Sequence, residues 1–114
     1  MSVIDWSRVS ELLEDFGEEE FGELVVVFLE ECRDGLEQLK QATSDDADRA
    51  AFHFLKGAAL NVGFVEIAEL CAKGETAAAH GEDRAEIKSE VASRLPQTCD
   101  QFEAEWRQRL SVGS

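Results

Sequence analysis

Residues 53–63 read HFLKGAALNVG, and this stretch decides how the rest of the chain folds. Apolar residues recur around it at spacings of four, three and four, at Ala51, Leu55, Ala58 and Val62. That is the period of an α-helix with one buried face. Capping residues precede it at 43–46 and Gly63 follows it, so the pattern predicts a helix over about 45–61.

The opposite face of this helix carries polar chemistry. On a helical wheel His53 lies nearly opposite the apolar face, with Arg49, Lys56 and Leu60 in the same outward sector and Gly57 at its edge. A solvent-facing histidine is often only a surface residue. A glycine inside a helix, however, costs about 1 kcal/mol and is typical of a close approach by another group.

Residue type then suggests what this face can do. Neutral imidazole is a good nucleophile near neutral pH and could accept a phosphoryl group from an acyl phosphate. Lys56, one turn from His53, could stabilise the added negative charge, and Arg49 could contribute a longer-range field. Gly57 would leave room for the phosphoryl group and for the surface that delivers it.

Helical patterns cover the remaining chain. They predict a short helix over about 6–16 and longer helices over about 18–42, 64–80 and 82–110. Val26, Val27 and Leu29 widen the apolar stripe of the second of these, which suggests that it is covered on two sides. Pro96 should kink the last helix or divide it into two stacked helices. The expected fold is all-α: an antiparallel four-helix bundle with a short additional N-terminal helix.

Length and composition limit the possible functions. A chain of 114 residues predicts a single domain over residues 1–114, with the last few residues disordered. The net charge of −14, from 25 acidic and 11 basic residues, argues against binding to nucleic acid or to anionic membranes. No signal peptide or membrane-spanning run is evident. Three separated cysteines are expected to be reduced core residues of a cytoplasmic protein, at positions Cys32, Cys71 and Cys99.

Other classes of site lack their motifs. No cysteine or histidine pair has metal-ligand spacing, and residues 45–56 lack the glycine and the glutamate of a calcium loop. Neither histidine follows a glutamate at the spacing that di-iron bundles use. There is no glycine-rich phosphate loop, which excludes an ATP-using kinase. His80 is expected to be a structural or surface residue at a helix end.

The sequence resembles a known family at these residues. His53-x-Leu55-Lys56-Gly57, with Gly63 six residues later, is similar to the signature of histidine-containing phosphotransfer (HPt) domains, and the resemblance extends over nearly the whole chain. It implies a non-enzymatic phosphocarrier in which His53 accepts a phosphoryl group from a receiver-domain aspartate and passes it to another. It further implies that Lys56 stabilises the phosphoryl group, Gly57 allows access and Gly63 makes the turn into the next helix.

The resemblance also implies the partners. These are response-regulator receiver domains and a hybrid histidine kinase. The protein is expected to be a monomer with no cofactor or metal of its own, and Mg²⁺ is expected on the receiver only. Arg49, Phe52 and Leu60 are the predicted docking residues. The alternative is a binding module that docks a receiver or kinase and inhibits it without carrying phosphate.

Overall fold

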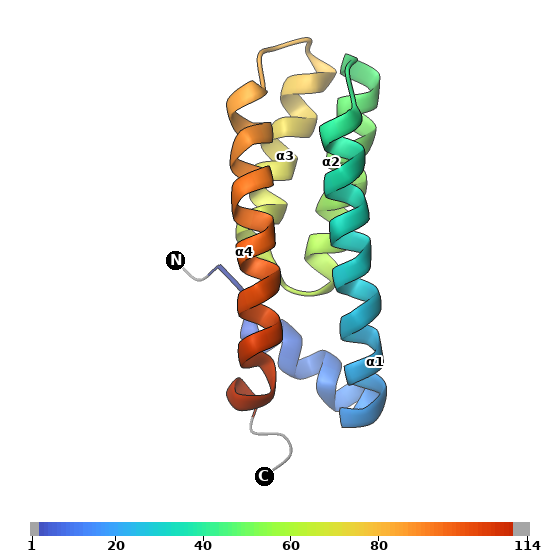
Figure 1. Ribbon diagram of the computed structural model, residues 1–114, viewed down its shortest axis with the longest axis vertical. Helices are drawn as coiled ribbons and strands as arrows, with labels where there is room; N and C mark the ends of the chain where they lie inside the picture. Colours follow the sequence, from blue (N-terminus) through green and yellow to red (C-terminus); the bar gives the residue numbers. More distant parts are fainter. Residues whose placement is uncertain (1–2, 111–114) are drawn as a thin grey trace.

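The computed structural model describes residues 3–110, which form four α-helices and no strand (Figure 1). They are α1 (Trp6–Gln41), α2 (Asp45–Asn61), α3 (Val65–Ala79) and α4 (Ala85–Arg109). The all-helical prediction is confirmed. The disorder expected after Leu110 and the outermost ends of the predicted domain lie outside the described residues.

The first helix contains a sharp break. Asp5 caps its start by accepting hydrogen bonds from the backbone N–H groups of Ser7 and Arg8. Gly17 then takes φ 81° and ψ 162°, a conformation that favours glycine, within what is otherwise one helical element. The segment before Gly17 crosses the lower end of the bundle in Figure 1, and the segment after it runs alongside the other helices.

Each helix packs against two others. The neighbouring pairs are α1–α2, α2–α3, α3–α4 and α1–α4, so α1 and α3 stand at opposite corners. One apolar core runs between the four helices; its largest fully buried side chains include Phe21, Phe52, Phe64 and Phe102. All three cysteines are free and buried in this core, and loss of hydration raises the pKa of Cys32 and Cys71 to about 12 and that of Cys99 to about 11.

Two glycines allow α2 to approach its neighbours closely. A Cβ atom placed on Gly74 of α3 would lie 2.4 Å from the ring of Phe52, and one on Gly35 of α1 would lie 2.9 Å from Leu55. Both glycines are buried. Side chains of α2 therefore occupy the space that larger residues would need, which fixes its position between α1 and α3.

The C-terminal end of α2 is held by a glycine turn. Gly63 has φ 79°, and its carbonyl accepts a 2.7 Å hydrogen bond from the backbone N–H of Asp5. A Cβ on Gly63 would lie 2.9 Å from the carbonyl oxygen of Asp5. The turn after α2 is thus fastened to the start of α1.

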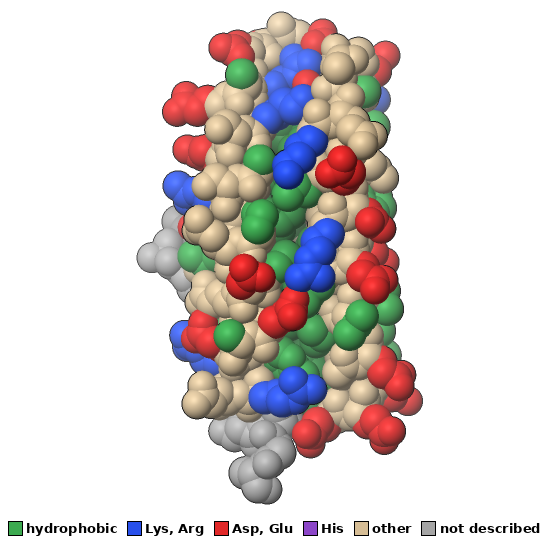
Figure 2. All heavy atoms as spheres, viewed as in Figure 1, with side chains coloured by type: hydrophobic (Ala, Val, Ile, Leu, Met, Phe, Trp, Pro, Cys, Tyr) green, Lys and Arg blue, Asp and Glu red, His purple; other side chains and the backbone are tan. Residues whose placement is uncertain are grey.

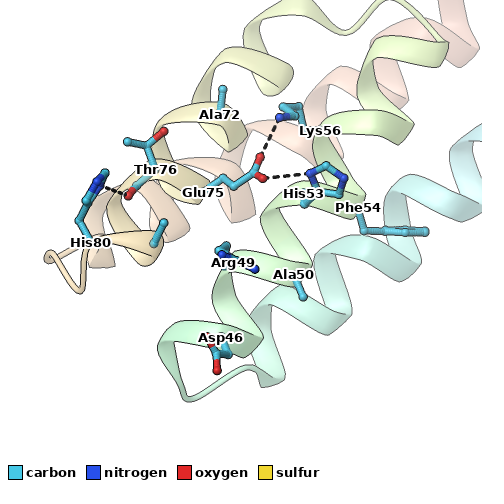
Figure 3. Close-up of a pocket in the computed structure, with 11 residues that line it drawn as sticks. Asp46, Arg49, Ala50, His53, Phe54, Lys56, Ala72, Glu75, Thr76 and His80 are labelled. Carbon is cyan, nitrogen blue, oxygen red and sulfur yellow. Dashed lines mark hydrogen bonds and ion pairs between the residues drawn. The ribbon is translucent and has the colours of Figure 1, made fainter.

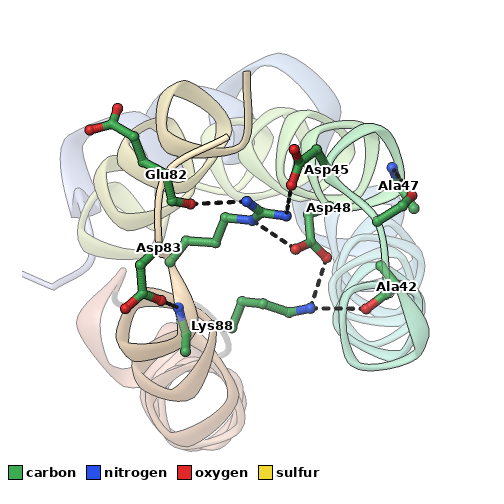
Figure 4. Close-up of polar contacts among 10 residues, drawn as sticks. Ala42, Asp45, Ala47, Asp48, Glu82, Asp83 and Lys88 are labelled. Atoms are coloured by element: carbon green, nitrogen blue, oxygen red, sulfur yellow. Dashed lines mark hydrogen bonds and ion pairs between the residues drawn. The ribbon is translucent and has the colours of Figure 1, made fainter. Parts of the chain in front are cut away.

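The N-terminal end of α2 is held by buried ion pairs (Figure 4). The carboxylate of Asp48, which is 4% exposed, accepts hydrogen bonds of 2.8 Å from Arg84 Nε and 2.7 Å from Lys88 Nζ. Lys88 also donates to the carbonyl of Ala42, and Arg84 donates to Asp45. Residues 82–84 are not helical, and α4 begins three residues later than predicted.

Two other expectations differ from the structure. The valines expected to be covered on α1 are exposed, Val26 by 56% and Val27 by 46%, because the segment before Gly17 crosses the end of the bundle instead of lying along α1. Pro96 is exposed within a single continuous α4, so of the two outcomes expected there the division into stacked helices is wrong, while a kink stays a prediction. A proline is tolerated where water can satisfy the helix hydrogen bond that it removes.

Candidate functional site

The outward face of α2 presents the residues singled out from sequence. The His53 side chain is 70% exposed, Arg49 is exposed, and Lys56 is partly buried. Leu60 is 51% exposed one turn beyond Lys56. These four residues therefore share one accessible surface.

Phe52 does not belong to this surface. Its side chain is fully buried against Gly74 in the contact between α2 and α3. The prediction that Phe52 contacts a docking partner is wrong, because the missing side chain at Gly74 lets α3 cover it. The neighbouring aromatic residue, Phe54, is 41% exposed instead.

Glu75 of α3 joins the two central residues of the site (Figure 3). One carboxylate oxygen lies 2.9 Å from His53 Nδ1, and the other accepts a 2.7 Å hydrogen bond from Lys56 Nζ. Glu75 is only partly exposed, at 24% of its side chain. It therefore holds both groups from the adjacent helix.

The charge on Glu75 decides which histidine nitrogen is free. The hydrogen bond from Lys56, and next that from His53, hold the pKa of the Glu75 carboxyl below its ordinary value. The carboxylate is ionised at neutral pH and can only accept, so Nδ1 of His53 carries the hydrogen. In the neutral ring the lone pair is then on Nε2, the nitrogen that Glu75 does not bind.

Gly57 faces open space on the same helix. A Cβ atom placed on it would meet no atom within 4 Å. Gly57 is thus unlike Gly35 and Gly74, since internal packing does not require it. Its missing side chain leaves clearance on the outer surface, one turn from His53.

An open groove of about 1020 Å³ runs along α2 and α3 beside the site. His53, Lys56 and Glu75 line one part of it, and Arg49 and His80 line the part towards the end of α3 (Figure 3). His80 Nδ1 donates a 2.9 Å hydrogen bond to the carbonyl of Thr76, at the C-terminal end of its helix. Arg49 forms no ion pair within residues 3–110, so its charge is available in the groove.

A smaller apolar groove of about 270 Å³ lies on the other side of Lys56. Its lining includes Leu60 of α2 together with Val65 and Ala68 of α3. The nucleophilic ring of His53 is therefore followed, along α2, by a cation and then by an apolar surface.

Sequence reasoning missed Glu75 as a functional residue. Nothing in a single sequence states which residues of α3 face His53. The available signal was Gly74, whose missing side chain permits the close contact with α2 that brings the next residue, Glu75, to His53 and Lys56.

No group of three or more histidine, cysteine or acidic side chains in residues 3–110 could hold a metal ion. In the same part of the chain no helix combines the length and apolar character needed to cross a membrane.

Comparison with known proteins identifies one family. The family model described as Hpt domain matches residues 23–105, which cover most of the chain and include α2, α3 and nearly all of α4. Comparisons with curated proteins and with solved structures find no match.

Proposed function

The chain belongs to the Hpt domain family, whose role is histidine phosphotransfer in two-component signalling, and from this we propose that it is a phosphorelay intermediate. His53 accepts a phosphoryl group from the aspartate of one receiver domain and passes it to the aspartate of another. The observation that carries this proposal is the His53 ring itself: it is exposed, and Glu75 binds its Nδ1 while Nε2 stays free.

The transfer needs no separate base. The Nε2 lone pair attacks the phosphorus of the aspartyl phosphate, the bond from phosphorus to the acyl oxygen breaks, and the receiver aspartate leaves as a carboxylate. The Nδ1 hydrogen stays in place, so the ring becomes a phosphorylated imidazolium. The carboxylate of Glu75, 2.9 Å from Nδ1, balances that positive charge. Attack by a second aspartate reverses the same steps.

Lys56 and Gly57 serve the phosphoryl group on the solvent side. Lys56 is held 2.7 Å from Glu75 at rest and, being a long flexible side chain one turn from His53, can turn towards the phosphoryl oxygens. The clearance at Gly57 admits both the phosphoryl group and the receiver surface. Arg49, which forms no ion pair within the described residues, contributes its charge from the neighbouring turn.

The remaining features of the proposal concern the protein as a whole. Arg49 and Leu60 are docking residues, Gly63 is the structural turn, and the partners are receiver domains and a hybrid histidine kinase. The carrier is a cytoplasmic monomer without a cofactor, and Mg²⁺ sits on the receiver. Its single domain, residues 1–114, is an antiparallel bundle in which 6–16 acts as a separate short helix.

Labelling of His53 tests the proposal. The purified protein is mixed with a phosphorylated receiver, and acid-labile phosphate is measured on the native chain and on His53→Gln. Because His53 is largely exposed, the variant should fold normally and take no label. Equal labelling of the two proteins would refute the assignment of His53.

The alternative is a module that binds a receiver or kinase without carrying phosphate. It predicts that the native protein takes no label while His53→Gln binds the receiver with unchanged affinity. Isothermal calorimetry on the same two proteins separates the two functions. The Nδ1 contact of Glu75, which a purely binding role would not need, favours the carrier.

Glu75→Gln tests the electrostatic part of the mechanism. The amide oxygen can still accept the Nδ1 hydrogen, but the charge that balances the imidazolium is lost. We expect the rate of phosphoryl acceptance to fall about tenfold, which is less than the roughly 100- to 1,000-fold cost of losing a fully preorganised contact to a developing charge, because Glu75 is 24% exposed. An unchanged rate would mean that Glu75 only orients the ring.

A further inference from the structure

A separate groove lies on the opposite side of the bundle from His53. His53 faces the groove between α2 and α3, whereas this one lies between α1 and α4, the other pair of neighbouring helices. It encloses about 280 Å³ over an apolar floor formed by Val25, Leu29 and Trp106. An adjoining hollow of about 550 Å³ shares three of its residues, Gly22, Val26 and Arg107.

One flexible side chain partly covers this groove. The guanidinium of Arg107 lies 4.3 Å from the centre of the Trp106 ring. A Cβ placed on Gly22 would lie 3.9 Å from the same guanidinium. Val26 beside it is the most exposed large apolar residue in the described chain, at 56%. Figure 2, which views this face, shows apolar side chains along the furrow between the two helices, with basic side chains lying across them.

The rim of the groove has an excess of negative charge. Glu30 lines the groove itself, and Glu18, Glu19 and Glu23 line the adjoining hollow. All four are exposed residues of α1, and none forms an ion pair within residues 3–110. Of the two lining cations, Arg33 is already neutralised by Glu103 at 2.6 Å. Only Arg107 is left to oppose the four carboxylates.

The combination of apolar floor and acidic rim selects one kind of occupant. A second copy of this chain carries a net charge of −14 and would be repelled, and so would nucleic acid or an anionic membrane. A helix with apolar residues on one face and lysine or arginine beside them satisfies both features. We propose that the α1–α4 groove docks a basic amphipathic helix of a partner protein.

This site would act at the same time as phosphotransfer. Since it lies across the bundle from His53, a bound helix leaves the α2–α3 face open. A kinase or regulator that holds the carrier here raises the effective concentration of its receiver domain at His53. Docking at this groove does not require phosphorylation of His53. It can therefore be measured on the unphosphorylated protein.

The experiment uses the full chain and a synthetic leucine–lysine helix of roughly 18 residues, which is about five turns long. Binding is measured by calorimetry near physiological salt and mapped by amide NMR, with a scrambled peptide of the same composition for comparison. We expect shifts at the indole of Trp106 and along residues 22–30, and unchanged signals at His53.

Two variants with the same charge change make the test specific. Val26→Lys places a cation in the groove and should weaken binding about tenfold, the scale of a central contact in an interface. Val27→Lys is the matched control: Val27 is also exposed but does not line either hollow, and its variant should bind nearly as well as the native chain.

Four results would overturn the proposal. Equal weakening by the two lysines, or equal binding of the scrambled peptide, would reduce the interaction to general charge attraction. NMR shifts centred on α2 and α3 would place the peptide at the phosphotransfer face. A native dimer in sedimentation that Val26→Lys dissociates would make the groove a contact between copies.

Discussion

Gly57→Ala should make the folded protein more stable and the phosphocarrier slower. Gly57 is an exposed position inside α2 with no atom within 4 Å of an added Cβ, so alanine meets no clash. Alanine is favoured over glycine in a helix interior by about 0.5–1 kcal/mol. With an unfolding entropy of about 2.1 cal/mol/K per residue, that gain raises the melting temperature of a chain of this size by about 2–4 °C.

Transfer should change in the opposite direction. The new methyl group projects from the outer surface one turn from His53, where the receiver must bring its aspartyl phosphate to Nε2. A displacement of the reacting atoms by about 1 Å can cost up to about 100-fold in rate, and we expect a loss of about tenfold for alanine. Circular dichroism melting and phosphoryl transfer from a labelled receiver measure the two effects on the same samples.

Gly22→Ala is the matched control. Gly22 is also inside a helix, and its nearest foreign atom is the Arg107 guanidinium at 3.9 Å, so alanine should stabilise the fold by a similar amount. It lies away from His53 and should transfer phosphate at the native rate. If Gly57→Ala is more stable but transfers equally fast, the clearance at Gly57 has no role in access. If it melts lower than the native chain, the open space described around Gly57 is incorrect.

Three further variants or conditions test the fold around the site. Gly74→Ala should lower the free energy of unfolding by about 1–3 kcal/mol through overlap with Phe52, as chemical denaturation would show; unchanged stability would contradict the close α2–α3 packing. Asp48→Ala leaves Arg84 with Asp45 alone and Lys88 without a carboxylate partner, and should cost about 1–3 kcal/mol; a loss below about 1 kcal/mol would mean that the pairs are well hydrated. The folded-state pKa of each buried thiol is raised, so above about pH 9 the native state keeps protons that the unfolded state loses. The free energy of unfolding should therefore fall as the pH rises, by up to about 1.4 kcal/mol per pH unit for each thiol. Denaturation midpoints at pH 8 and pH 10 measure this loss of stability. Equal midpoints would refute the raised pKa values of Cys32, Cys71 and Cys99.

The outward face of α2 could be predicted because a helix has a fixed period. Four apolar residues defined its buried side, and His53, nearly opposite to them, is exposed in the structure. Phe52 lies about 90° from the centre of that apolar face, where the period alone does not decide burial. Its environment depends on a neighbour from another helix, Gly74, and this is why the prediction for Phe52 failed.

Contacts between helices were not accessible in the same way. The sequence contains Glu75 but does not state how far α3 is shifted along α2, and that shift brings the carboxylate to His53. Likewise the helical wheel placed Gly57 at the edge of the outward face of α2, but it did not predict the roles of Gly35 and Gly74. The structure shows that these two receive side chains of α2, whereas Gly57 faces open space.

The ion pairs at the start of α2 have a consequence for inheritance. Asp48 binds both Arg84 and Lys88 at a largely buried position. A mutation of Asp48 leaves Lys88 without its carboxylate, and a mutation of either cation leaves Asp48 with one charged donor fewer, so selection should remove such single changes. Descendants of this chain should therefore keep all three residues or exchange them together for an apolar set. Among related sequences these positions, 36 and 40 residues apart, would vary as a linked group, and their joint changes would record the packing of α4 against α2.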